Sequence, residues 1–163
     1  IGNSICEDDK QELALSILAT AKEKGVEIHL PQDVVAGDAF SNDANQQIFP
    51  IDQIPDGWEG MDAGPESVAH FAKVVSQSKT ILWNGPLGDY EHGFGAQTEG
   101  LAHVIAQAKG YAVIGGGDTI AAVENLRCQE SIGFMSTAGG AMLTFLESGD
   151  LPAIAAIVER EQA

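Results

Sequence analysis

The stretch ILWNGPLGDYE (residues 81–91) joins an apolar run to a loop rich in glycine and proline. The apolar run predicts a buried strand over residues 80–84, because it is short, continuous and bounded by turn residues. Glycine and proline at this density predict a loop of defined shape rather than a continued strand. The stretch closes on the carboxylate of Glu91. A buried strand therefore leads straight into a polar loop.

The same pattern occurs twice more along the chain. A predicted strand over 111–115 leads into GGGDT (115–119), and one over 131–135 leads into STAGG (136–140). Both loops pass directly into predicted helices. Strands that are apolar throughout and alternate with helices are typical of a parallel sheet covered on both faces. The sequence therefore predicts an α/β chain, a Rossmann-like three-layer α/β/α fold with a mostly parallel sheet.

A strong helix is predicted at the start of the chain, where apolar residues recur at three- and four-residue steps. Its apolar face is formed by Leu13, Ile17, Leu18 and Ala21. That helix is expected over 7–24, followed by strands over 26–30 and 33–40 and by a polar surface segment over 41–60 with a short strand near Ile48. Further helices are expected over 65–76, 97–108 and 151–160. Two more follow the second and third glycine-rich loops and end at about residues 126 and 146.

The composition is strongly acidic. The 163 residues include 8 Lys plus Arg and 24 Asp plus Glu, for a net charge of −16, and the mean hydropathy is near zero. Such a chain repels nucleic acid and anionic lipid, so we expect neither as a partner. No apolar run approaches the roughly 20 residues that span a bilayer. Any phosphate ligand must be held mainly by backbone amides and a metal ion, since cationic side chains are scarce.

Cysteine and histidine give no metal motif. Cys6 and Cys128 have no metal-ligand spacing, and we expect free thiols in a reducing, cytoplasmic compartment. The chain begins without Met, as though cut from a longer protein. The histidines are scattered without the spacing of metal ligands, so we expect ordinary surface or partly buried residues at His29, His70, His92 and His103. Nucleophilic catalysis is likewise unsupported.

The three glycine-rich loops indicate a ligand site. In a parallel sheet, ligands bind beyond the carboxyl ends of the strands, and first-turn helix amides attract anions. Asp118 is placed either to cap its helix or to coordinate a magnesium ion that bridges phosphate oxygens. Alone, GGGDT is explained equally well by tight helix–strand packing with Asp118 as N-cap, STAGG favours a capped helix start, and Glu91 is typical of a solvated loop acid. Together they favour a phosphate or nucleotide site, which is neither a P-loop nor a dinucleotide-binding turn because both motifs are absent.

Read in order, these motifs resemble those of the phosphoglycerate kinase family. The resemblance rests on IGNSICEDD, LPQDVV, IPDGWEGMDAGPES, WNGPLGDYE, GGGDT and STAGGAMLTFLESGDLPAI, and it covers essentially the whole chain. It implies a kinase that transfers a phosphoryl group between 1,3-bisphosphoglycerate and ADP. It also implies that residues 1–163 are the later part of a C-terminal domain that binds Mg-ADP or Mg-ATP. The N-terminal substrate domain and a phosphate-contacting lysine loop would be absent, so we expect this chain to be inactive alone.

The resemblance also assigns roles to individual residues. The residues that it places around the base and ribose are Gly60, Met61 and Glu91. The residues that it places beside the nucleotide, in the loop after the strand over 80–84, are Asn84 and Pro86. Those matching the phosphate and magnesium segment are Gly116, Gly117, Asp118 and Thr119, with Asp118 nearest the metal. Those at the helix start facing the transferring phosphoryl group are Gly139 and Gly140.

Three positions depart from the family pattern. Asp89 adds an acid to the first loop, which should weaken nucleotide binding a little if its carboxylate points inward. Ala138 replaces a glycine and would cost about 1 kcal/mol if that position needs a positive φ. Ala96 and Gln97 stand where the family has Lys-Gly, which removes a cation. A stand-alone nucleotide-binding or scaffold module without kinase activity is the alternative function.

Overall fold

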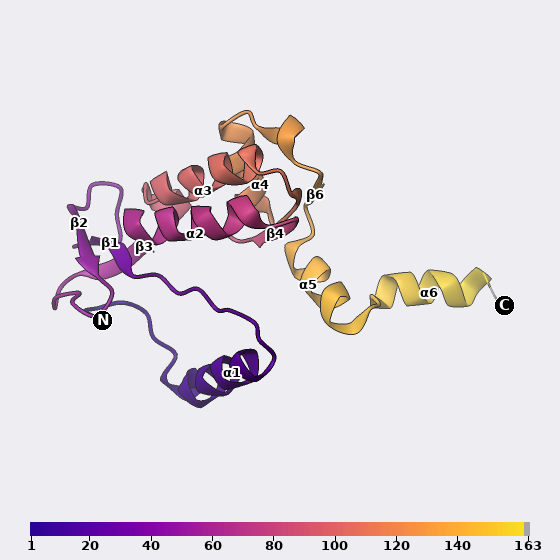
Figure 1. Ribbon diagram of the computed structural model, residues 1–163, viewed down its shortest axis with the longest axis horizontal. Helices are drawn as coiled ribbons and strands as arrows, with labels where there is room; N and C mark the ends of the chain where they lie inside the picture. Colours follow the sequence, from indigo (N-terminus) through magenta and orange to yellow (C-terminus); the bar gives the residue numbers. More distant parts are fainter. Residues whose placement is uncertain (162–163) are drawn as a thin grey trace. The chain divides into compact units, whose positions relative to one another are not determined.

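The computed structural model describes residues 1–161, except for the side chains of 159–161, and it divides into two compact units. The first unit contains Ile1–Lys73 and Leu87–Gly100, and the second contains Val74–Pro86 and the chain from Leu101 onward. The division falls inside two helices, α2 (Pro65–Gln77) and α3 (Ala96–Gln107) (Figure 1).

The first unit is built on an antiparallel sheet with strand order β2-β1-β3. Its strands are β1 (Asp33–Gly37), β2 (Gln46–Pro50) and β3 (Glu59–Ala63). The loop between β1 and β2 is short and carries no helix, whereas a parallel pair would need a crossover of a dozen or more residues. The predicted strands near 33–40 and Ile48 are confirmed. Strand β3 was missed because Glu59, Gly60 and Asp62 interrupt its apolar pattern.

The predicted first helix is present as a short 3-10 turn followed by α1 (Gln11–Glu23). Its apolar face stays exposed, with Leu13 56% and Ile17 52% accessible. The strand predicted over 26–30 is wrong. The segment is extended, but it pairs with no other strand of the described chain, and an extended segment becomes a strand only when a neighbour takes its backbone hydrogen bonds.

The second unit holds a parallel sheet with strand order β4-β5-β6. Its strands are β4 (Thr80–Asn84), β5 (Tyr111–Gly115) and β6 (Phe134–Ser136). The connections contain α3 and α4 (Gly117–Asn125), the helical crossovers that parallel neighbours require. The first two strands have the predicted bounds. The third begins three residues late, because residues 129–131 form a 3-10 turn.

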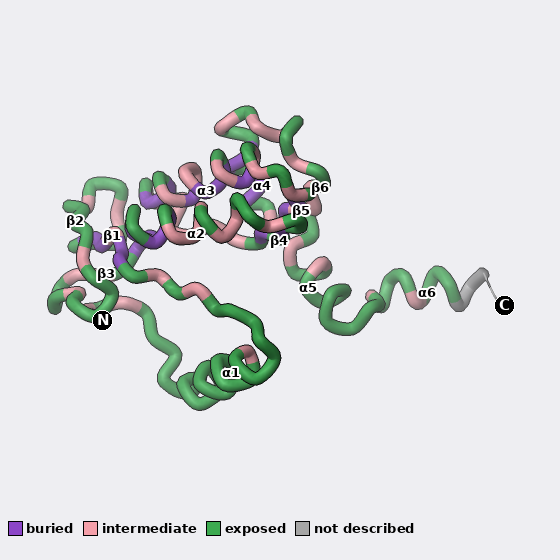
Figure 2. Tube along the Cα trace, in the orientation of Figure 1, coloured by how far each residue is buried: buried purple, intermediate pink, exposed green. Residues whose placement is uncertain are grey.

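The core of the second unit comes from alternate residues of β4 and β5 and from one face each of α3 and α4. The residues buried there are Ile81, Trp83, Leu101, Ala102, Ile105, Ala112, Ile114, Ile120, Ala122 and Val123. Figure 2 shows this burial along the strands and helices, whereas α5 (Gly139–Ser148) and α6 (Pro152–Glu161) are largely exposed. The chain therefore has the predicted α/β fold with a parallel sheet, but three of its strands form a separate antiparallel sheet.

Among residues 1–161, no single helix is long and apolar enough to cross a membrane. The pair α5 and α6 reaches the necessary length and composition only with a bend of 66° between its two helices.

Candidate functional site

The three glycine-rich loops meet at one edge of the parallel sheet in the second unit. Asn84 pairs in register with Gly115, and Gly115 with Ser136, so the three strands end side by side. The amide of Gly116 donates a hydrogen bond of 3.1 Å to the Ser136 carbonyl. The strand ends predicted to carry the site thus lie together, as the parallel topology requires.

The side chain of Asn84 sits where these loops converge. A Cβ atom placed on Gly115, Gly116 or Gly139 would lie 2.9, 3.4 or 3.2 Å from Asn84 Oδ1. The side-chain amide group of Asn84 makes no hydrogen bond to another described residue, and the residue is exposed. Asn84 therefore offers both a donor and an acceptor to a ligand at this edge.

The glycines at this edge fall into two kinds. Gly116 has a φ of +93°, and a Cβ on Gly139 would lie 3.0 Å from the Gly116 Cα, so both are needed for the loops to approach each other. By contrast, a Cβ on Gly117 or Gly140 would meet nothing within 4 Å. Gly116 and Gly139 therefore shape the loops, whereas Gly117 and Gly140 leave open space beside the helix starts.

Helices α4 and α5 begin at this edge, with Gly116 and Ala138 as their N-caps and no side-chain capping hydrogen bond at either start. The first three amides of a helix have no carbonyl partner inside it. Those of residues 117–119 and 139–141 are therefore available to an external acceptor. Two adjacent helix starts of this kind form an environment suited to an anion.

Two sequence alternatives at this edge are resolved. Asp118 does not cap α4, because Gly116 is the N-cap and Asp118 is the second residue of the helix, with an exposed side chain. Ala138 has a φ of −99°, so the cost considered for a positive φ does not arise. Thr119 is fully buried, and its Oγ1 accepts a 2.9 Å hydrogen bond from the amide of Gly85, which ties the first loop to α4. Pro86 follows this anchored glycine.

In the first unit, Gly60 and Met61 border a cavity of about 370 Å³. The remaining walls come from Pro31, Val34, Asp62, Ala63, Phe71 and Leu87. Most of this lining is apolar, which suits a flat, weakly polar group. Phe71 and Leu87 were not predicted, because nothing in the sequence separates them from ordinary core positions. The amide of Gly60 is taken by Ser4 Oγ at 2.9 Å.

Glu91 lies in a 3-10 turn, Tyr90–His92, and is exposed. Its carboxylate makes no hydrogen bond to the described residues. The neighbouring acid behaves differently: Asp89 Oδ2 lies 2.7 Å from His92 Nδ1, so this extra carboxylate is held by the adjacent imidazole. This contact orients the Asp89 carboxylate toward His92 but leaves its negative charge in the first loop.

Asp62 is a second residue that the sequence did not single out. It is 5% exposed on β3 and accepts hydrogen bonds from the amides of Ala63 at 2.8 Å and Gln97 at 3.2 Å. Burial raises the pKa of Asp62 to about 6, and the two amide hydrogen bonds only partly oppose this rise. A buried carboxyl group with a raised pKa is a common feature of functional sites.

The loop edge lacks cationic side chains. Residues 84–91, 115–119 and 136–141 contain no Lys or Arg. Backbone amides, the Asn84 amide group and hydroxyl groups are the donors present, and Asp118 is the carboxylate placed at a helix start. This set of groups can hold phosphate oxygens only through amides and a shared cation, as the composition implied.

Comparison with known proteins supports a specific family. The phosphoglycerate kinase family model matches residues 1–149. The chain is 50% identical over 163 residues to phosphoglycerate kinase of Microcystis aeruginosa (strain NIES-843 / IAM M-2473), covering 98% of this chain and 40% of that protein. It is 45% identical over 163 residues to the cytosolic phosphoglycerate kinase of Triticum aestivum, with 98% and 41% coverage. The chain thus spans about 40% of the length of these relatives.

Solved structures agree with the sequence relatives. The structure of phosphoglycerate kinase from Coxiella burnetii superimposes with a TM-score of 0.89 at 39% identity, covering 98% of this chain and 41% of that one. Phosphoglycerate kinase from Pyrococcus horikoshii OT3 gives a TM-score of 0.65 at 24% identity, covering 90% and 37%, and shows likeness of fold alone.

Proposed function

Because the chain belongs to the phosphoglycerate kinase family, we propose that it carries nucleotide-binding elements of a glycolytic phosphotransferase. The reaction proposed is transfer of a phosphoryl group between 1,3-bisphosphoglycerate and ADP, giving 3-phosphoglycerate and ATP. Support comes from relatives named phosphoglycerate kinase that match nearly all of this chain. Since the chain spans about 40% of those relatives, the activity belongs to a longer protein.

The observation that carries the proposal is the pair of helix starts in the second unit. Amides at the starts of α4 and α5 would bind phosphate oxygens, with Gly117 and Thr119 on α4. Gly116, the N-cap whose own amide is bonded to Ser136, would let the loop approach the phosphates closely. Gly139 and Gly140 would face the transferring phosphoryl group. Phosphoryl transfer depends mainly on positioning and on stabilising negative charge, and fixed amides do both without reorganising. Asn84 and Pro86 would position the nucleotide at the same edge.

Asp118 fits the magnesium ion that such a reaction uses. Magnesium prefers oxygen ligands and is commonly bound through one or two carboxylates together with substrate phosphates. Asp118 offers one exposed carboxylate beside the free amides of α4. Bound with the nucleotide, the ion would neutralise part of the phosphate charge. Asp118 would hold it, and the amides would orient the phosphates.

The base and ribose are assigned to residues of the first unit. Gly60 and Met61 would line the base, supported by the largely apolar cavity that they border. Glu91 would accept hydrogen bonds from the ribose hydroxyl groups, supported by its exposed carboxylate, which has no partner among the described side chains.

Two further parts of the proposal concern the whole protein. We assign 3-phosphoglycerate binding to a separate N-terminal domain outside these residues, and we expect the isolated chain to show no turnover in a coupled assay. A cytoplasmic location is supported by relatives in wheat and tobacco that are named cytosolic. Turnover by rigorously purified chain would contradict the first assignment.

Calorimetry of the 163-residue chain with Mg-ADP and with metal-free ADP tests the site. Asp118→Ala should weaken Mg-ADP binding and leave metal-free ADP binding nearly unchanged, because the carboxylate acts through the metal. Glu124→Ala, on the exposed side of the same helix, is the control and should change neither. Equal losses for both ligands in Asp118→Ala would reject the metal role. In the longer enzyme, Asp118→Ala should lower the rate more than it lowers affinity for metal-free ADP.

A further inference from the structure

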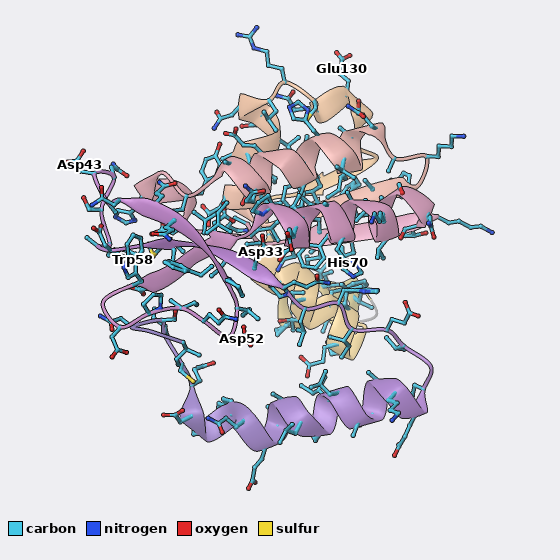
Figure 3. All side chains as sticks on the ribbon, turned by 60° about the vertical axis from the view of Figure 1, so that its left-hand side comes forward. Asp33, Asp43, Asp52, Trp58, His70 and Glu130 are labelled. Carbon is cyan, nitrogen blue, oxygen red and sulfur yellow. The ribbon has the colours of Figure 1, made fainter. Side chains whose placement is uncertain are left out.

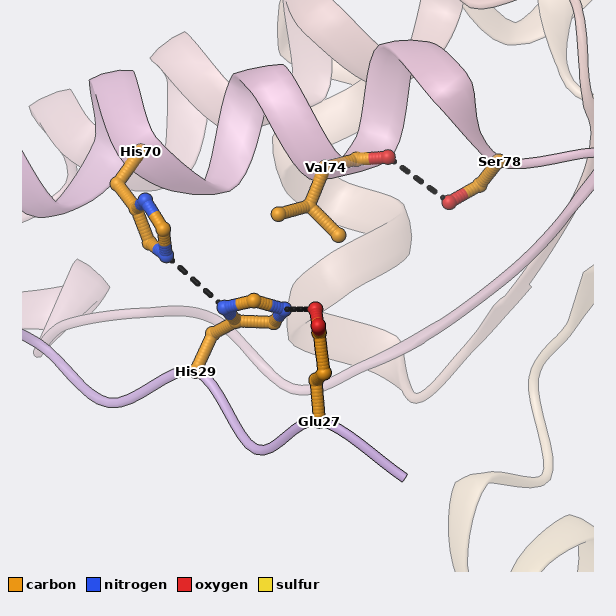
Figure 4. A network of polar contacts seen from close by, with 5 residues as sticks. All are labelled: Glu27, His29, His70, Val74 and Ser78. Carbon is orange, nitrogen blue, oxygen red and sulfur yellow. Dashed lines mark hydrogen bonds and ion pairs between the residues drawn. The ribbon is translucent and has the colours of Figure 1, made fainter. Parts of the chain in front are cut away.

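A histidine pair in the first unit lies outside every loop discussed above. His29 is in the extended segment that follows α1, and His70 is in the middle of α2. Their nitrogens His29 Nδ1 and His70 Nε2 are 2.9 Å apart, and the ring centroids are 4.9 Å apart with the planes tilted by 59°. Figure 4 shows the two nitrogens facing each other. Because 41 residues separate the histidines in sequence, their spacing could not predict the pair.

Glu27 lies beside the other ring nitrogen of His29. Its Oε2 lies 3.4 Å from His29 Nε2, on the far side of the ring from His70. A carboxylate there favours a proton on Nε2, which leaves the Nδ1 lone pair directed at His70. His70 Nε2–H then donates to that lone pair. A single proton thus lies between His29 Nδ1 and His70 Nε2, and without it both nitrogens could direct a lone pair at one point.

We propose that this pair is a binding site for a divalent transition metal ion, with Zn²⁺ as the representative ion. The ligands are His29 Nδ1 and His70 Nε2, and Glu27 is the carboxylate that orients His29. A carboxylate hydrogen-bonded to the outer nitrogen of a ligating histidine is the usual support of such sites. The metal takes the place of the shared proton, which passes through solvent to His70 Nδ1.

The distance suits this exchange. Two nitrogens about 2.0–2.1 Å from a tetrahedral zinc ion lie about 3.3 Å apart, so the pair must open by about 0.4 Å from its present 2.9 Å. Rotation of two side chains can supply this, since neither is enclosed: His29 is 27% exposed and His70 is partly exposed. An ion can therefore reach the pair from solvent.

The remaining ligands would be water. Within the described part of the chain, no three His, Cys, Asp or Glu side chains come together as a metal cage. The site is thus a two-histidine site of moderate affinity and not a closed structural one. Imidazole nitrogens also separate it from the proposed nucleotide metal, because magnesium prefers oxygen ligands.

Binding would have a structural effect. The segment over 26–30 pairs with no strand of the described residues, and His29 brings it into contact with α2. A metal shared by His29 and His70 would join this segment to α2. Zinc should therefore raise the melting temperature of the chain, as any ligand of the folded state does.

Calorimetric titration of the 163-residue chain with Zn²⁺ tests the proposal, with a large excess of Mg²⁺ present to occupy carboxylates. We expect one zinc ion per chain. His29→Ala and His70→Ala should each weaken binding at least tenfold, and Glu27→Gln, an exposed and conservative change, about tenfold. His103→Ala, an exposed histidine on α3, is the matched control and should bind as the unchanged chain does.

A second measurement protects the test from folding artefacts. Circular dichroism should show unchanged helix content in all variants, and nitrogen-15 spectra of the unchanged chain should show zinc shifting His29 Nδ1 and His70 Nε2. The proposal would be overturned if zinc failed to bind, if His29→Ala and His70→Ala bound zinc as tightly as the unchanged chain, or if His103→Ala lost as much affinity as they did. Zinc-induced shifts confined to other histidines would overturn it as well.

Discussion

The two units differ in what accepts hydrogen bonds from the first amides of their helices. In the first unit, α2 and α3 begin against carboxylates of the chain itself: Asp33 accepts from the amides of Glu66 and Ser67, and Asp62 accepts from the amide of Gln97. In the second unit, α4 and α5 begin with no capping side chain. The starts of α2 and α3 are thus met by carboxylates of the chain, whereas those of α4 and α5 leave helix amides for an anion from outside.

This contrast separates a structural helix start from a binding one. A helix N-terminus carries a partial positive charge and unpaired amides wherever it occurs, so its presence alone identifies no site. What differs is whether a side chain of the protein already accepts hydrogen bonds from those amides. At α4 and α5 no described side chain does, and that difference is the structural support for the proposed phosphate position.

The two internal carboxylates also differ from each other. Burial raises the pKa of Asp33, but hydrogen bonds from the Ser67 hydroxyl group and from the amides of Ser67 and Glu66 outweigh burial, so its pKa is below the ordinary value. Asp62 has two amide donors and no hydroxyl donor, and burial dominates, with a pKa of about 6. Both occupy helix starts, but only Asp33 (Figure 3) is fully stabilised as an anion.

The largest effect is expected for Asp33→Ala. The change removes the acceptor for the Glu66 and Ser67 amides, at 3.0 and 2.8 Å, and for the Ser67 hydroxyl group at 2.6 Å. All are buried or partly buried, so the free energy of unfolding should fall by about 3 kcal/mol. Chemical denaturation at pH 7 measures the loss.

Asp38→Ala is the control for this comparison. Asp38 also accepts two hydrogen bonds, from the Asn45 amide and side chain, but it is exposed. Its removal should cost much less stability than the removal of Asp33, because water replaces the lost contacts of an exposed group. Similar losses for the two variants would show that burial does not set the value of the Asp33 contacts.

Asp62 should make stability depend on pH in the opposite sense to Asp33. Its folded pKa of about 6 is above the ordinary value, so the folded state binds the proton more tightly, and stability falls as pH rises from about 4 to 6. The loss is on the order of 2 kcal/mol. Asp33, with its lowered pKa, adds stability above about pH 4 that is lost as pH falls through its folded value.

Asp62→Asn separates these two contributions. Asparagine cannot ionise, so the variant should gain about 2 kcal/mol relative to the unchanged chain between pH 4 and pH 7. Urea denaturation across that range provides the measurement. A difference between the two proteins that stays constant with pH would mean that Asp62 titrates near its ordinary value.

Thr119→Val tests the anchoring of the open edge. Valine keeps the shape of this fully buried residue but removes the acceptor for the Gly85 amide at 2.9 Å. The expected loss of stability is about 1–2 kcal/mol, the cost of an unsatisfied amide. Thr80→Val, at the exposed start of β4, is the control and should have little effect. Equal stability of Thr119→Val and the unchanged chain would show that water satisfies Gly85.

Much of the second unit was predictable, because its signals are local. Continuous apolar runs gave the bounds of β4 and β5, and glycine clusters gave the starts of α4 and α5. Parallel strands then place those loops at one edge with little further information. The open helix starts were not predicted, because Asp118 was placed to cap α4 and STAGG alone favours a capped helix, whereas the N-caps are Gly116 and Ala138.

The first unit was less predictable, because its signals are tertiary. Strand β3 is polar at two of its five positions, and its identity depends on pairing with β1. The carboxylates of Asp33 and Asp62 reach helix starts more than 30 residues away, at Ser67 and Gln97. The pairing of His29 with His70 is equally distant. No periodicity or motif encodes such contacts.

The smallest effect on stability is expected for Gly140→Ala, and it bears most directly on the difference between the two kinds of helix start. A Cβ at this position meets nothing within 4 Å, and alanine favours a helix over glycine, so the free energy of unfolding should rise by about 0.5–1 kcal/mol. If the α5 start holds a phosphoryl group, the added methyl group occupies the ligand's space and Mg-ATP binding should weaken while the fold is strengthened.

Gly25→Ala, at an equally open position beyond the end of α1, is the control for added bulk, although its φ of +68° makes alanine strained there. Calorimetry with Mg-ATP and thermal melts of both variants measure the two effects. A more stable Gly140→Ala chain that binds Mg-ATP as tightly as before would show that nothing packs on this helix start, and the contrast with α2 and α3 would then have no functional meaning.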